Sequence, residues 1–272
     1  MKICLVADRT DHPVLGAMLA RLEARHRTRL LVSASMDDVV AAEVAEPADV
    51  YLLKARSPIA LELAQRLERD GVVIVNTAAA TARCRDRVAM ARALDAAGIP
   101  APRTLATGTL GDVAGAVDVP AMVKSRLSRR GDLVRSVATR AELESLAAGW
   151  AQELVIVQEL CADDGWDYKA WVIGDDVHTG RRLSPLQTGA IGDEKRNHPI
   201  SDRAVERLLT DLARAAGRAF GLELFGIDVL MNAGGAYVID VNAFPGFRGV
   251  PDAAAKLAAY AEGVAGRTGA AA

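Results

Sequence analysis

Hydrophobic residues in the first 76 positions form short runs that alternate with helix-like patterns. Apolar runs at residues 2–7, 28–34, 49–55 and 72–76 enclose helical patterns at residues 14–26 and 59–70. This rhythm predicts βαβ units that form a parallel sheet. No GxGxxG follows the first run, so the fingerprint of a dinucleotide site is missing. We therefore expect a structural or substrate-contacting α/β domain.

The pattern changes after residue 76. A helix is predicted over residues 86–97, where apolar residues recur three positions apart, and Gly98 with Pro100 ends it. Further strands are predicted at residues 121–125, 133–137, 153–160, 167–175, 176–183, 225–232 and 236–242, with helices at 140–149, 202–220 and from 253 onward. The predicted fold class is α/β and α+β, in three parts: an N-terminal parallel α/β domain over 1–76, a central α+β unit over 77–160 and a C-terminal α+β unit over 161–272.

Composition narrows the functional classes. The chain has 272 residues, 51% of them hydrophobic, which is enough for a sizeable core. Its 33 basic and 35 acidic residues nearly cancel, so we expect neither nucleic acid nor a membrane as a partner. The first apolar run is too short to cross a bilayer. The three cysteines are widely spaced without a CxxC pair, which argues against disulfides and structural zinc. A reducing cytoplasm fits best.

Polar residues interrupt two apolar strands near the end of the chain, in GIDVL and VIDVN. Asp240 and Asn242 are two apart and face the same side of a strand. If the two strands pair as a hairpin, Asp228 lies opposite them, and two carboxylates and one amide oxygen surround a hard cation such as Mg²⁺. The alternative is that these residues only cap backbone groups at strand ends.

Lys124 closes the apolar strand PAMVKS and precedes the turn SRLSRRGD. Gly131 and the backbone N–H groups of this turn could fold over phosphates, although a lysine on an edge strand can also serve only against aggregation. Arg87 lies in the first turn of its helix, where a capping Asp86 explains the polar cluster without any ligand.

Two further segments carry candidate residues. Arg181 and Arg182 either form a solvated strand end or stabilise a phosphoryl group in transfer. The segment VIVQEL could offer backbone groups to an adenine edge while a following carboxylate takes ribose hydroxyls, although nothing in the pattern demands adenine. Its residues are Gln158, Glu159, Leu160 and Cys161, followed by Asp167 and Lys169.

In this order, the segments between residues 76 and 252 resemble the ATP-grasp superfamily. The resemblance implies an ATP-grasp fold behind an N-terminal pre-ATP-grasp domain, with ATP between the central and C-terminal units. Lys124 matches an ATP-binding lysine, SRRGD the loop that covers phosphate, and QELC the adenine hinge. Asp167 and Lys169 match polar residues after the hinge. Arg87 stands where the family usually has lysine, which is a departure.

The resemblance also implies the cofactors. Asp228, Asp240 and Asn242 match the family's ligands for Mg²⁺, for which Mn²⁺ can substitute, and ATP is the implied nucleotide. Relatives of this kind act on small-molecule or peptide substrates and are often dimers, so a homodimer is an expectation.

Two branches of the superfamily compete. The helix after NTAAAT and the segment VIDVNAFPG resemble RimK-like carboxylate–amine ligases, in which an amine attacks an acyl phosphate. Arg181 or Arg182 would steady that intermediate, and the loop over residues 184–198 with the turn at Pro245 and Gly246 would line the acceptor pocket. However, SPLQTGAIGDEKRNHP departs from the ligase pattern.

The segments RRLSPL and NAFPGFRGVPD, together with Lys54, resemble inositol-phosphate kinases of the same fold. Lys195 and Arg196 would then bind substrate phosphates. The hinge loop CADDGWD lacks the histidine of those kinases and is acidic, which disfavours a highly phosphorylated substrate. A third possibility is a non-catalytic domain that senses ATP. Without GxSxG, a serine hydrolase is a poor alternative.

Overall fold

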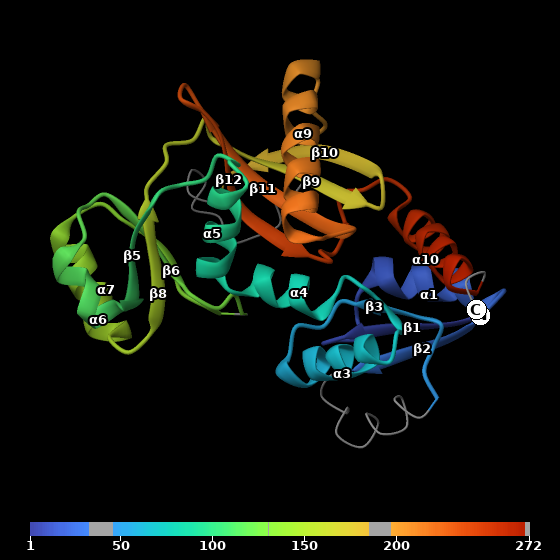
Figure 1. Ribbon diagram of the computed structural model, residues 1–272. Coiled ribbons are helices and arrows are strands. Elements are labelled where there is room, and N and C mark those ends of the chain that lie inside the picture. The colour runs from blue at the N-terminus through green and yellow to red at the C-terminus, as the bar shows by residue number, and fades with distance from the viewer. Residues whose placement is uncertain (33–45, 130, 185–196, 270–272) are drawn as a thin grey trace.

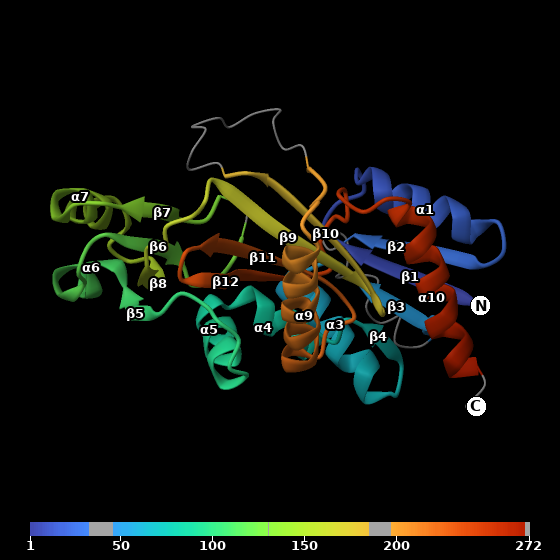
Figure 2. The ribbon, with the colours of Figure 1, turned by 90° about the horizontal axis from the view of Figure 1, so that it is seen from above.

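The computed structural model describes residues 1–32, 46–129, 131–184 and 197–269. These residues form three four-stranded sheets, which follow one another across the molecule (Figure 1). Seen from above, the sheet of the middle of the chain lies at one end, the sheet of the C-terminal part in the centre and the N-terminal sheet at the other end (Figure 2). The combination of α/β and α+β parts is confirmed.

The N-terminal sheet is parallel, as predicted, with strand order β2-β1-β3-β4. Its strands are β1 (Lys2–Ala7), β2 (Arg27–Val32), β3 (Val50–Leu53) and β4 (Val73–Val75), and its helices are α1 (Pro13–Glu23) and α3 (Pro58–Arg69). The inner strands β1 and β3 are covered on both faces and are therefore apolar on both sides, whereas the edge strand β2 is largely exposed. Ile3 and Leu5 pack in the core on the α1 side, whereas Cys4 and Val6 pack in the core on the α3 side.

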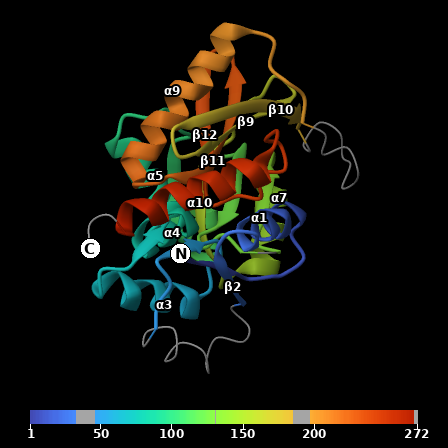
Figure 3. The same ribbon diagram turned by 90° about the vertical axis from the view of Figure 1, so that its right-hand side faces the viewer.

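The last helix, α10 (Ala253–Gly269), returns to the N-terminal sheet. Its Leu257 and Ala261 share one core with Met18 and Leu22 of α1, and α10 lies beside α1 (Figure 3). The sequence placed this helix with the C-terminal unit because it follows that unit in the chain. Its apolar face is instead buried against the first domain, so both ends of the chain contribute to one core.

The central sheet is antiparallel, with order β5-β8-β6-β7. Its elements are β5 (Thr104–Thr109), α6 (Leu110–Val113), the 3-10 turn η2 (Ala114–Ala116), β6 (Ala121–Ser125), β7 (Val134–Val137), α7 (Arg140–Trp150) and β8 (Leu154–Glu159). Strand β5 was not predicted, because TLATGT shows no apolar alternation. It forms by pairing with β8 through an irregular register near Thr104.

The C-terminal sheet is antiparallel, with order β10-β9-β11-β12. Its strands are β9 (Trp166–Ile173), β10 (Asp176–Leu183), β11 (Leu224–Asn232) and β12 (Gly235–Ala243), and α9 (Arg203–Phe220) covers one face. Two earlier helices, α4 (Ala78–Arg85) and α5 (Arg87–Ala96), share this core. Their residues Ala80, Cys84, Met90 and Leu94 therefore pack with the C-terminal sheet, although the sequence grouped this segment with the central unit.

Asn76 fastens the first domain to the C-terminal sheet. Its Nδ2 donates to the carbonyl of Leu224 at 2.6 Å, and its Oδ1 accepts from the N–H groups of Glu223 and Leu224 at 2.8 and 3.0 Å. The side chain is buried, so these bonds satisfy polar groups that water cannot reach. None of the helices in the described segments combines the length and apolar character needed to cross a bilayer.

Candidate active site

A β-bulge between β11 and β12 sets the orientation of the predicted metal ligands. Asp228 pairs with Asp240 and Gly226 with Asn242, but Val229 pairs with Val238, so Ile239 has no partner in the register. An extra residue in one strand shifts the alternation of its side chains. Val238 therefore lies in the α9 core, and Asp240 with Asn242 faces the opposite side of the sheet.

On that side, charged residues form a row across three strands. Lys169 of β9 is the register partner of Asp228, which is the partner of Asp240. Lys169 forms an ion pair with Asp228, and Asn242 donates its Nδ2 to Asp240 at 3.0 Å. Burial and the nearby Asp228 charge raise the pKa of Asp240 above its usual range, against the opposing charges of Arg87 and Lys124. The row therefore confines two acidic groups where a cation would stabilise both.

Lys124 reaches this face from the central sheet. It lies on β6, is buried, and donates its Nζ to the carbonyl of Ile239 at 3.4 Å. That carbonyl belongs to the extra residue of the bulge, which is left outside the regular pairing. Burial and then Arg87 lower the pKa of Lys124, while Asp240 opposes both. The two sheets thus bring a buried ammonium group and the acidic pair to one place.

Arg87 joins the same cluster and also holds the loop after β6. Asp86 caps α5, as expected, by accepting from the N–H groups of Val88 and Ala89. The Arg87 guanidinium takes no part in this cap and donates a hydrogen bond to the Asp132 carboxylate at 2.6 Å. Both side chains of this pair are largely buried. The neighbouring Gly131 has a φ of 74°, a left-handed conformation that favours glycine, so the loop turns back onto the helix.

The structure separates the two arginines that the sequence treated together. Arg182 lies on the side of the acidic row, where its Nε and Nη2 bond Asp167 at 3.2 and 3.1 Å. Arg181 lies on the α9 side, with its guanidinium carbon 4.2 Å from the centre of the Trp166 ring. Successive residues of a strand face opposite sides, so only Arg182 is directed toward the candidate phosphoryl site.

The side chains of the predicted hinge mostly hold the linker before β5. Gln158 is buried and donates its Nε2 to the carbonyl of Pro102 at 3.3 Å. The Glu159 carboxylate accepts from the Arg103 N–H at 2.9 Å. These contacts fix the end of β8 against residues 102–103. The two side chains are therefore engaged within the protein, and an adenine base would have to be contacted by backbone groups after Glu159.

Leu160 and Cys161 follow β8 and are half-buried. Burial raises the pKa of the Cys161 thiol, the Glu159 charge raises it further, and Lys124 opposes both effects. The charge of Lys124 therefore reaches the hinge, as binding of one nucleotide by both would require.

The predicted substrate residues lie where the first domain meets the loop after β12. Lys54 follows β3 and is half-buried, and burial followed by the Arg56 charge lowers its pKa to about 8. Pro245 packs on the sheet, since a Cβ added to Gly226 would lie 3.3 Å from its Cγ. Gly246 lies against His12, because an added Cβ would come within 2.6 Å of Nε2.

His12 was not identified from the sequence. The available signal was its place in DRTDHP, a polar segment between the first strand and the first helix. Lys195 and Arg196, which the kinase interpretation used, lie outside the described residues.

The donor set fits a magnesium ion that is shared with phosphate. Among the described residues, no three His, Cys, Asp or Glu side chains form a metal cage, so the protein offers a partial shell of two carboxylates. Asn242 would add its Oδ1 if its amide turned over, since Nδ2 faces Asp240 here. Mg²⁺ commonly takes one or two carboxylates and completes its shell with substrate phosphates and water.

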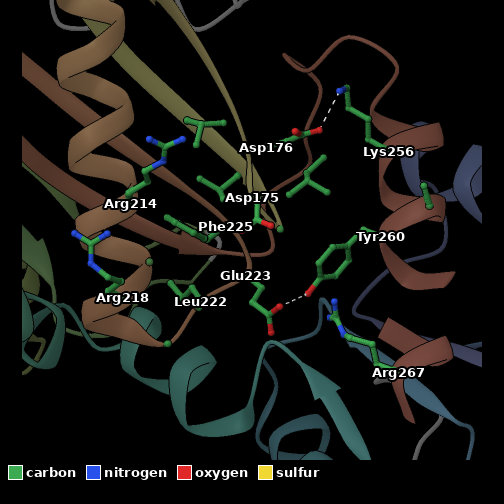
Figure 4. A pocket seen from close by; sticks show the side chains of 17 residues that line it. Asp175, Asp176, Arg214, Arg218, Leu222, Glu223, Phe225, Lys256, Tyr260 and Arg267 are labelled. Carbon is green, nitrogen blue, oxygen red and sulfur yellow. Dashed lines mark hydrogen bonds and ion pairs between the residues drawn. The ribbon is translucent and has the colours of Figure 1, made fainter. Parts of the chain in front are cut away.

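A cavity of 910 Å³ lies away from this cluster. Figure 4 shows Arg214 and Arg218 of α9 facing Tyr260 and Lys256 of α10 across it. None of the residues predicted from the sequence lines this cavity. This cavity is therefore not the candidate active site, which is the cluster where Lys124 meets Asp228 and Asp240.

The chain is similar to known proteins both in sequence and in structure. Residues 189–261 match the family described as the inositol 1,3,4-trisphosphate 5/6-kinase ATP-grasp domain. A probable alpha-L-glutamate ligase 2 of Shewanella amazonensis is 28% identical over 70% of this chain and 65% of its own length. A probable alpha-L-glutamate ligase of Xanthomonas oryzae is 30% identical over 68% of this chain and 65% of its own length. The matched region thus spans slightly less than two thirds of these relatives.

Solved structures share the fold. A RimK domain ATP-grasp protein of Sphaerobacter thermophilus superposes with a TM-score of 0.73 at 24% identity, over 96% of this chain and 100% of that chain. A D-alanine–D-alanine ligase of Bacillus anthracis gives a TM-score of 0.75 at 16% identity, over 98% of both chains. The chain therefore has the fold of these ATP-grasp and ligase structures, and its sequence is similar to probable alpha-L-glutamate ligases.

Proposed function

We propose that this protein is an ADP-forming carboxylate–amine ligase that uses ATP and Mg²⁺ to form an amide bond through an acyl phosphate. The observation that carries the proposal is the convergence of Lys124, from one sheet, on the row of Asp228 and Asp240 in the next. This is a place where polyphosphate and a hard cation can be held together. The glutamate ligase relatives support the choice of reaction.

The roles of the side chains follow from their positions. Lys124 and Arg87 would bind the phosphates of ATP, and the hinge at Leu160 and Cys161 would contact the base through its backbone. Bound to Asp228, Asp240 and Asn242, Mg²⁺ would neutralise charge on the terminal phosphates. No protein nucleophile is needed, because phosphoryl transfer depends on positioning and electrostatic stabilisation.

Arg182 is the residue we assign to the transferring phosphoryl group. Asp167 holds its guanidinium on the site face through two hydrogen bonds, so the group is oriented before substrate arrives. A fixed cation at the place where charge develops stabilises a transition state without reorganisation. Lys54, Pro245 and Gly246 would border the pocket for the acid.

The test is magnesium-dependent ADP release with panels of carboxylic acids and amines, with products identified by mass spectrometry. Release that requires both partners, with a product lighter by one water than their sum, supports a ligase. The Asp240→Ala variant should lose this activity, and Asp211→Ala on the exposed side of α9 is the matched control. Lack of turnover with every pair, despite ATP binding, would contradict the proposal and favour an ATP-sensing domain.

A small-molecule kinase is the second candidate, because residues 189–261 match the inositol trisphosphate kinase family. The same experiment separates the two reactions. A kinase leaves the phosphoryl group on its substrate and needs no amine, so inositol phosphates belong in the panel.

A further inference from the structure

The cavity of 910 Å³ lies between two helices that pack in different cores. Arg214 and Arg218 of α9 line it on one side, and Lys256, Tyr260 and Arg267 of α10 line it on the other. Helix α9 covers the C-terminal sheet, whereas α10 packs on α1 in the first domain. Ligand sites typically have volumes of about 300 to 1,000 Å³ and often lie at such boundaries. The cavity is therefore large enough for a small molecule.

Apolar groups form part of the cavity wall. Leu222 and Phe225 line it and are otherwise buried. Gly217 brings α9 close to this wall, because an added Cβ would lie 2.9 Å from Cζ of Phe225. Gly174 does the same for the turn between β9 and β10, because an added Cβ would lie 3.0 Å from Cδ2 of Tyr260. Apolar surface of this kind can take the hydrophobic part of a ligand.

Two of the acidic groups at the cavity are already engaged (Figure 4). Asp176 pairs with the Lys256 Nζ at 3.3 Å, and the Glu223 carboxylate accepts from the Tyr260 hydroxyl at 2.9 Å. Burial and then the Glu223 charge raise the pKa of Tyr260, so the hydroxyl keeps its proton and remains a donor at neutral pH. Of the acidic side chains that line the cavity, Asp175 alone has no such partner among the described residues.

The arginines at the cavity lack acidic partners. Within the described segments, Arg214, Arg218 and Arg267 form no ion pair. Arg214 and Arg218 are four residues apart on α9, so they lie on one face of the helix and repel each other. Three unpaired guanidinium groups and one unpaired carboxylate, that of Asp175, leave the cavity with an excess of positive charge. An anion would relieve the repulsion.

We propose that the cavity binds a small phosphorylated molecule. Its phosphate is held by Arg214 and Arg218, and its apolar part lies between Phe225 and Tyr260. Guanidinium groups bind phosphate through paired hydrogen bonds, and the charge of a phosphate and its three acceptor oxygens can serve two arginines at once. The cavity is separate from the candidate active site, so this ligand is distinct from the nucleotide and from the acid and amine of the proposed reaction. Because it contacts α9 and α10 together, it joins the C-terminal sheet to the first domain.

The test uses phenyl phosphate as the probe and dimethyl phenyl phosphate as its neutral counterpart, in calorimetric binding to the full chain without ATP. Phenyl phosphate should bind at least about ten-fold more tightly than the neutral ester. Arg214→Gln and Arg218→Gln should each weaken its binding about ten-fold. Arg207→Gln is the matched control, because it removes the same charge from an exposed position of α9 outside the cavity and should leave the affinity unchanged.

Equal binding of the charged and neutral probes would overturn the proposal. So would an unchanged affinity for phenyl phosphate in both Arg214→Gln and Arg218→Gln. Both arginines are exposed, so these variants should fold. Inorganic phosphate should bind more weakly than phenyl phosphate, and equal binding would contradict the role of Phe225 and Tyr260. These measurements need no turnover, so they stand or fall independently of the ligase reaction.

Discussion

Asp240→Asn should stabilise the ligand-free protein while abolishing its response to magnesium. Asp228 and Asp240 are register partners on one face of the sheet, which places their Cβ atoms about 5 Å apart. At that separation and an effective dielectric of about 20, two like charges repel by about 3 kcal/mol. Lys169 and Lys124 offset part of this repulsion. We therefore expect the neutral amide to gain about 1 to 2 kcal/mol, which raises the Tm by about 3 to 6 °C.

The sign of the pH dependence follows from the raised pKa of Asp240. The folded protein holds this proton more tightly than the unfolded chain, whose carboxyl has its ordinary pKa of 3.8. Stability is therefore lost as pH rises through the interval between the unfolded and folded pKa values. The advantage of Asp240→Asn should vanish below about pH 4 and should grow as the pH rises above that value.

The assay is thermal unfolding of the protein and its Asp240→Asn variant, each with ATP alone and with ATP plus Mg²⁺. The unsubstituted protein should gain Tm on addition of Mg²⁺, whereas the variant should not. Asp211→Asn, an exposed change of the same chemistry, should behave like the unsubstituted protein. A lower Tm for the ligand-free variant would refute the electrostatic argument, and a full magnesium response would refute the assignment of Asp240 as a metal ligand.

Three further substitutions test other parts of the site. Arg87→Met should weaken ATP binding, measured by calorimetry, about ten-fold. Asp132→Asn, which removes the ion pair but keeps the arginine, should not weaken it. If both variants weakened ATP binding equally, the role of Arg87 would be only to hold the loop after β6. Arg182→Ala should lower kcat about 100-fold with little change in Tm. Arg181→Ala should keep kcat but lower the Tm by about 2 to 4 °C, because its contact with Trp166 is lost. The reverse pattern would show that Arg181, and not Arg182, acts in catalysis. Asn76→Ala should cost about 2 to 4 kcal/mol in urea unfolding, because buried backbone groups lose their partners, and a cost below about 1 kcal/mol would contradict its role as a fastener.

Much of the fold could be predicted because periodicity and burial agree. Alternating and continuous apolar runs identified the strands of the N-terminal and C-terminal sheets. Asp228 and Asp240, which interrupt the apolar pattern, identified the charged face of the C-terminal sheet. Helix α4 escaped prediction because AAATARCR has no amphipathic period; its small residues Ala80 and Cys84 are buried by close packing under the sheet. Such burial depends on a neighbour that is distant in the chain.

The site was less predictable where it depends on pairing between distant segments. Whether the Ile239 carbonyl is available to Lys124 depends on the register of two strands, which a single strand pattern does not reveal. The separation of Arg181 from Arg182 was accessible, since alternation along a strand requires it. The contact of His12 with Gly246 joins residues more than two hundred positions apart, and only the folded chain reveals it.

The side chains assigned to ligand binding are already paired with one another. Asp228 is neutralised by Lys169, and the Arg87 cation by Asp132. A magnesium ion alone must compete with Lys169 for the carboxylate, and ATP alone must compete with Asp132 for the guanidinium. When both ligands arrive together, the released cations can turn to the phosphates while the metal takes the carboxylates, so each lost ion pair is replaced. Mg²⁺ and ATP should therefore bind cooperatively, and each should increase the affinity for the other by the same factor.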